Sequence, residues 1–214
     1  MIVSEVLRSR GQFAVGAPSI PWRPLICVFS AATLGYGVVM GTWSGRAFQV
    51  LYSGLKAPIL LGGTTLICLP NFYVLGAALG LRDDLEAALR GVLTSQATVG
   101  LALASAAPLT GLVYVSGCSY AGATLANGLA FLLATLAGQW TLARHYEPLI
   151  RKNRRHIIAL IAWVVLYQFV AIQLAWSLRP FIGDPSATTT FLRPESWTNA
   201  YVDAAAAMRM FLER

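Results

Sequence analysis

Residues 91–143, GVLTSQATVGLALASAAPLTGLVYVSGCSYAGATLANGLAFLLATLAGQWTLA, form a run of 53 positions without a charged or histidine side chain. A helix needs about 20 predominantly apolar residues to cross a bilayer, so this run is long enough for two spans. The segment SGCSYAG at residues 116–122 is rich in small, turn-forming residues and provides the connection between them. The run therefore predicts a helical hairpin embedded in a membrane.

Three further windows lack charged residues and are long enough for one span each: residues 24–45, 57–81 and 157–178. The total is then five spans. The composition agrees, because 57% of the 214 residues are hydrophobic and 12% are charged, whereas soluble domains contain about 25% charged residues. So little charge does not cover the surface of a soluble domain. We predict an all-α integral membrane protein with about five transmembrane helices.

The distribution of Lys and Arg predicts the orientation and the domain boundaries. Residues 1–23 are predicted to be cytoplasmic, 24–178 to form the transmembrane domain, and 179–214 to form an external tail. This arrangement places ten of the sixteen basic residues on the cytoplasmic side, as positively charged loops usually are. The net charge of +7 is explained in the same way, so nucleic acid is not expected as a partner.

The first span lacks a clear signal-peptidase site, and we interpret it as an uncleaved anchor. A bacterial-type inner membrane is the predicted location, with the N-terminus cytoplasmic and the C-terminus periplasmic. An organelle membrane is the alternative.

Two short segments between the spans have amphipathic patterns. In residues 46–56, polar side chains recur on one helical face, at Arg46, Gln49, Ser53 and Lys56. This pattern predicts an interfacial helix in the membrane plane, which ends where Pro58 turns the chain into the second span. Residues 82–90 are expected to behave similarly.

The tail is expected to begin with an extended connection and to continue as an external amphipathic helix from Pro194. That helix would rest on lipid, on the protein itself or on a partner. Its apolar face includes Trp197, Tyr201, Met208 and Phe211.

The most informative chemical observation is an absence. None of the five predicted spans contains Asp, Glu, Lys, Arg or His, which argues against a proton-coupled transporter and a charge-based channel. His145 and His156 are predicted to lie in a basic loop, without the spacing of metal ligands, and the three Cys lack C-x-x-C spacing. No nucleophile or nucleotide-binding motif occurs. We therefore expect no enzymatic activity, no metal and no cofactor.

The uncharged polar residues of the spans have two interpretations, helix packing or a solute path. The principal candidates are Pro70, Asn71, Gln96, Gln168 and Gln173. The basic loop at residues 144–156 is interpreted as a topology anchor, or as a contact for anionic lipid or an acidic partner. Its candidate residues are Arg144, Arg151, Lys152, Arg154 and Arg155. Small residues four apart permit close approach of helix backbones and together favour a compact bundle or tight contact with neighbouring chains. They are Gly37/Gly41, Gly100/Ala104 and Gly122/Ala126.

Several segments resemble an uncharacterised family of bacterial five-span integral membrane proteins. The resemblance is carried by WSLRPFIGDP (176–185), FLRPESWTNAY (191–201), the stretch from KAP (56–58) to LP (69–70) and YQFVAIQ (167–173). It covers most of residues 50–201 and brings no catalytic residues with it. Some members are labelled actin-binding, but no LKKT-like motif occurs here, so that label is not carried over. The five-span layout is also similar to that of Yip1-type membrane proteins, as an analogy of architecture only.

Together these features predict a non-catalytic subunit or assembly factor of a larger membrane complex. Its expected partners are membrane lipids and either other membrane subunits or further copies of the chain. The alternative is a small transporter or lipid-handling protein that works without buried charges. A lipid-modifying enzyme is a distant third hypothesis, because no loop shows an acid–base pair.

Overall fold

The protein is described here by a computed structural model, which describes residues 22–183, 188–192 and 199–202. It confirms the all-α architecture, and no strand occurs within these ranges. Five helices are long and apolar enough to cross a membrane. They are α2 (Trp22–Gly41), α3 (Ala47–Ala78), α4 (Leu85–Val115), α5 (Tyr120–Lys152) and α6 (Arg155–Leu178).

The connections between the helices are short. The 3-10 helices η1 (Thr42–Ser44) and η2 (Arg82–Asp84) lead into α3 and α4, respectively. The predicted turn between the third and fourth spans is confirmed: α4 ends at Val115, and the Ser119 hydroxyl accepts a hydrogen bond from the Gly122 backbone N–H at the start of α5. Gly117, in this turn, has φ +77°, a backbone conformation that favours glycine.

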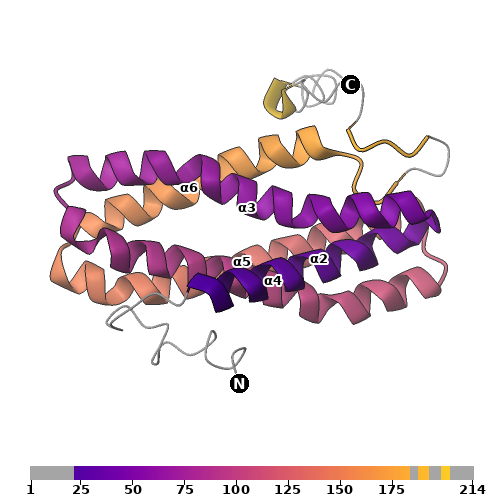
Figure 1. Ribbon diagram of the computed structural model, residues 1–214, viewed down its shortest axis with the longest axis horizontal. Coiled ribbons are helices and arrows are strands. Elements are labelled where there is room, and N and C mark those ends of the chain that lie inside the picture. Colours follow the sequence, from indigo (N-terminus) through magenta and orange to yellow (C-terminus); the bar gives the residue numbers. More distant parts are fainter. Residues whose placement is uncertain (1–21, 184–187, 193–198, 203–214) are drawn as a thin grey trace, which may run out of the picture.

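The helices form two layers, with α3 and α6 in one and α2, α4 and α5 in the other (Figure 1). Helix α2 packs on both α3 and α4, α5 packs on α4, and α6 packs mainly on α3. Helices α5 and α6 make few contacts with each other, although they follow one another in the chain. The bundle has two ends, which we call the basic end, where α3 meets α4 and α5 meets α6, and the tail end, where α6 finishes.

Helix α2 is shorter than its neighbours. It has 20 residues, whereas α3 has 32 and α4 has 31. At 1.5 Å per residue, α2 is about 18 Å shorter than α3. Figure 1 shows α2 beginning part-way along α3 and α4, well inside the basic end. The space between α3 and α4 is therefore not covered by α2 over its whole length.

Small residues bring the helices together at some of the predicted positions. A side chain at Gly37 or Gly41 would overlap the α3 backbone, and one at Gly100 would press on α2. Gly122 makes no such contact within this chain, because a side chain there would meet only Cys118 and Ser119 of its own turn. Gly138 takes its place, since a side chain there would overlap Val99 and approach the α4 backbone. Gly138 lies four residues after the buried Ala134, so the α4–α5 contact uses the same four-residue spacing at a pair that the sequence analysis did not single out.

The two predicted interfacial helices do not occur. Residues 47–56 form the first turns of α3, which continues through Pro58, and residues 85–90 begin α4 directly after η2. Pro58 removes one backbone hydrogen bond, but Gly54 and Ala57 beside it are buried in the contact with α2. This packing keeps the helix continuous where the local sequence favours a turn.

Candidate functional site

A groove of about 300 Å³ opens where α5 and α6 separate. Its walls come from α3, α5, α6 and the segment that follows α6, together with Met40 of α2. Small side chains recur along it, and at Gly128 a side chain would meet no atom within 4 Å. The small residues of the walls are Thr124, Gly128, Thr135, Ala171 and Ala175. Such residues let helix backbones approach closely in membranes.

Gln168 gives this groove its chemical character. It is the fourteenth of the 24 residues of α6, close to the middle of the span, and its half-buried side chain lines the groove. Its amide hydrogen-bonds to no residue in the described part of the chain. An amide at mid-membrane depth is costly without a hydrogen-bond partner, because lipid tails offer none.

Asn127 also lines the groove, but it differs from Gln168 because both the oxygen and the nitrogen of its side-chain amide are hydrogen-bonded. Its Oδ1 accepts a hydrogen bond from the Tyr36 hydroxyl at 2.9 Å, and its Nδ2 donates to the Tyr114 hydroxyl at 2.6 Å and to the Ala123 carbonyl at 2.7 Å. This network joins α2, α4 and α5. Asn127 therefore holds the three helices together, whereas the side-chain amide of Gln168 is available to form hydrogen bonds with a further group.

The tail-end wall of the groove is formed by non-helical chain, residues 179–183 and 188–192, which we call the strap. Phe181 and Ile182 of the strap line the groove. The strap follows α6 and crosses back to α3, so it connects the groove to the first turns of that helix. The position of the strap therefore sets the shape of the groove at the tail end.

Three polar side chains of α3 hold the strap. Gln49 donates a hydrogen bond to the Phe181 carbonyl at 2.9 Å, Ser53 donates to the same carbonyl, and Lys56 donates to the Pro180 carbonyl at 2.6 Å. The Lys56 ammonium also lies 5.1 Å from the centre of the Phe191 ring. Non-helical backbone at membrane depth needs such partners, because its carbonyls are not satisfied within a helix.

This arrangement corrects the predicted role of the polar stripe in residues 46–56. Gln49, Ser53 and Lys56 are fully buried instead of facing water. Lys56 lies about 14 Å along α3 from its first residue. Helix α3 is about 48 Å long, so it is longer than the thickness of a hydrocarbon core, about 30 Å. The charge-free windows are thus parts of longer helices, one of which carries a buried lysine.

Two of the predicted polar residues serve helix packing. Gln96 is buried on α4, and its Oε1 accepts a hydrogen bond from the Tyr167 hydroxyl of α6 at 3.0 Å. Gln173 accepts one from the backbone N–H of Ala200 at 3.0 Å.

Pro70 and Asn71 are exposed on α3, which runs unbroken through both.

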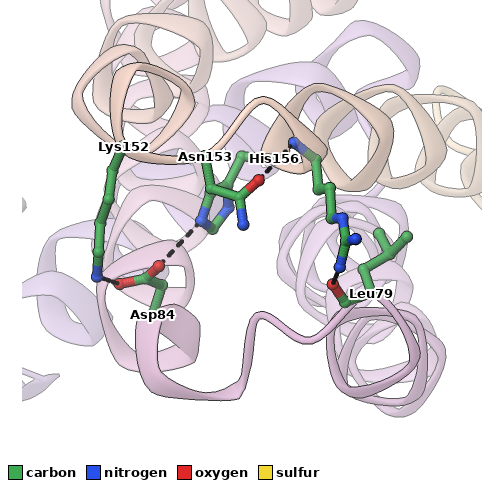
Figure 2. A network of polar contacts seen from close by, with 6 residues as sticks. Leu79, Asp84, Lys152, Asn153 and His156 are labelled. Carbon is green, nitrogen blue, oxygen red and sulfur yellow. Dashed lines mark hydrogen bonds and ion pairs between the residues drawn. The ribbon is translucent and has the colours of Figure 1, made fainter.

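At the basic end, a polar cluster joins the two helix connections. The Asp84 carboxylate lies between the Lys152 ammonium at 2.6 Å and His156 Nε2 at 3.2 Å, as Figure 2 shows. Arg155 donates a hydrogen bond to the Leu79 carbonyl at 3.1 Å. The α3–α4 connection is thereby tied to the α5–α6 connection, so the cluster is a structural clamp.

The predicted basic loop is mostly helical. Residues 144–152 extend α5, and α6 begins at Arg155, so only Asn153 and Arg154 connect the two helices. All five predicted basic residues are exposed: Arg144, Arg151, Lys152, Arg154 and Arg155. His145 and His156, by contrast, are buried in the helices. Within the described ranges, no group of three or more His, Cys, Asp or Glu could hold a metal ion.

Of the predicted tail contacts, only Tyr201 can be placed. Its ring stacks on Phe169 of α6 at 4.5 Å, and its hydroxyl donates a hydrogen bond to the Phe169 carbonyl at 2.7 Å. Trp197, Met208 and Phe211 lie outside the described residues.

Sequence reasoning missed the roles of Lys56, Phe181 and Asp84. For Lys56 a signal existed, because it shares a helical face with Gln49 and Ser53, but the partners of that face lie more than 120 residues away.

Comparison with protein-family models, with curated proteins and with solved structures finds no match to this chain. The features that bear on its function are the groove, the strap and the two ends of the bundle.

Proposed function

We propose that the protein is a non-catalytic subunit or assembly factor of a larger membrane complex, and that a transmembrane helix of a partner subunit occupies the groove between α5 and α6. The observation that carries the proposal is the amide of Gln168, which lies at mid-membrane depth beside open space and small residues. A helix with a polar side chain at that level would satisfy the amide and approach the backbone at Gly128.

The test is photo-crosslinking in native membranes from position 171, where Ala171 lines the groove. A crosslink to a different membrane protein is expected, and Gly128→Leu should abolish it by filling the groove. Gly35→Leu is the matched control, because a side chain at Gly35 also meets no atom within 4 Å but lies on α2. A crosslink to a second copy of the chain would show that the partner is another copy and the complex a homo-oligomer. Crosslinks to lipid alone would overturn the proposal.

A small transporter or lipid-handling protein is the second candidate, and it is favoured by the volume of the same groove and by its apolar strap wall of Phe181 and Ile182. Gln168→Leu separates the two functions. Partner binding through the amide would weaken, whereas an acyl chain in the groove would be retained or bound more tightly.

The proposed location is a bacterial-type inner membrane with the basic end cytoplasmic. The exposed arginines of that end, Arg151, Arg154 and Arg155, support this orientation. The test is labelling of single cysteines at positions 154 and 189 by a membrane-impermeant maleimide, in a variant without the native cysteines. Labelling of position 154 from outside intact cells would reverse the orientation.

A further inference from the structure

A second groove lies at the beginning of α2 and differs chemically from the first. It has a volume of about 320 Å³ and lies between α2, α3 and α4, where α2 begins inside the basic end. Its walls are mostly large and apolar, and the residues that define it are Leu25, Ile26, Phe29, Leu69 and Leu93.

The polar side chains of α3 and α4 in this groove already have partners. Thr65 donates a hydrogen bond to the Leu61 carbonyl at 2.8 Å, and Gln96 accepts one from Tyr167. The Oε1 atom of Gln96 is thus paired, whereas the amide of Gln168 in the other groove has no partner among the described residues. The space is therefore suited to a hydrocarbon chain, which offers no hydrogen bonds and requires none.

The mouth of the groove has the composition of a lipid headgroup site. Trp22 lines the groove and is 43% exposed, as tryptophans at membrane interfaces commonly are. Arg23 is exposed and has no ion pair or hydrogen bond with any described residue. It precedes Ile26 and Ser30 of the groove by three and seven positions, so it lies on the same face of α2, toward the basic end.

We propose that this groove binds an anionic glycerophospholipid of the surrounding membrane. One acyl chain lies against Leu25, Phe29 and Leu93, and the phosphate is bound by the guanidinium of Arg23. Arginine suits this role because its planar donors match the oxygens of a phosphate group. A lipid here fills the space that the short α2 leaves between α3 and α4.

The test uses the full chain, purified in detergent and incubated with palmitoyl-oleoyl phosphatidylglycerol or with the phosphatidylcholine of the same chains. Native mass spectrometry counts the lipids that stay bound. We expect one phosphatidylglycerol per chain, retained in preference to phosphatidylcholine. Arg23→Gln should reduce this preference about fivefold, the effect of one basic residue at a membrane surface.

Gly62→Leu is the second variant, because Gly62 lines the groove and a longer side chain there projects toward Phe29. It should abolish binding of both lipids, whereas Gly35→Leu, on the exposed face of α2, should leave both unchanged. Binding to the Gly62→Leu variant at the level of the unmodified chain would overturn the proposal. So would binding only after residues 1–20 are deleted, because the chain itself would then be the occupant.

Discussion

The ammonium of Lys56 lies 2.6 Å from the backbone oxygen of Pro180, so a buried cation of α3 holds the chain that follows α6. Lys56→Met keeps the length of the side chain but removes the donor. The Pro180 carbonyl then loses its partner, at a cost of about 1–3 kcal/mol, which the removal of a buried charge partly offsets. We expect faster proteolysis within residues 179–192, measured by mass spectrometry of the fragments.

Lys152→Met is the control for this experiment. The Lys152 side chain is 64% exposed, so solvent screens its ion pair with Asp84 and the pair should contribute little to stability. Cleavage of the strap at the same rate in both variants would show that Lys56 does not hold it.

Gly183 lies where the strap packs against Gln49 of α3. Its φ is +84°, and an added Cβ would lie 2.8 Å from Cγ of Gln49. Gly183→Ala should therefore lower the melting temperature through backbone strain and overlap together. Gly45→Ala measures the backbone strain alone, because Gly45 has φ +67° and open space around it. The strain alone amounts to about 1–2 kcal/mol, and equal losses in the two variants would mean that Gln49 yields without cost.

The spans were predictable from the sequence because each is a long, charge-free run, and the insertion of a helix into a membrane depends on this local property. The ends of the helices were not predictable. Pro58 favours a turn locally, but packing of α2 against Gly54 and Ala57 keeps α3 helical. The amphipathic pattern of residues 46–56 was real, yet the pattern alone does not distinguish water from backbone carbonyls as the partner of its polar face.

The candidate site, too, was predictable only where the signal is local in the sequence. Gln168 was identifiable as a polar residue within a span, whereas its lack of a partner depends on the separation of α5 from α6, which no local pattern reports. Gly122 satisfies the spacing rule but faces only its own turn, whereas Gly138, four residues after Ala134, makes the contact with α4. Spacing identifies small residues but does not reveal which of them face another helix.

Two glycines, Gly111 on α4 and Gly138 on α5, should respond to substitution by alanine with opposite changes in melting temperature. An alanine in a helix interior is more favourable than glycine by about 0.5–1 kcal/mol, so Gly111→Ala should raise the melting temperature, because its side chain enters open space. Gly138→Ala should lower it, because the new methyl group overlaps Val99 at a cost of about 1–3 kcal/mol. Thermal unfolding in detergent measures both. Stabilisation by both substitutions would mean that α5 can move away from α4 freely.

The two polar residues Gln96 and Asn71 should respond in opposite ways to the same substitution. Gln96→Leu removes the acceptor of the Tyr167 hydroxyl in the core, and polar contacts between membrane helices average about 0.6 kcal/mol. Asn71→Leu replaces an exposed amide without a described partner by an apolar side chain, and should leave stability unchanged or raise it. Unfolding in detergent and in lipid nanodiscs measures both, with Tyr167→Phe combined with Gln96→Leu to isolate the pair. A solute path through these residues would instead give loss of transport in both single variants without loss of stability.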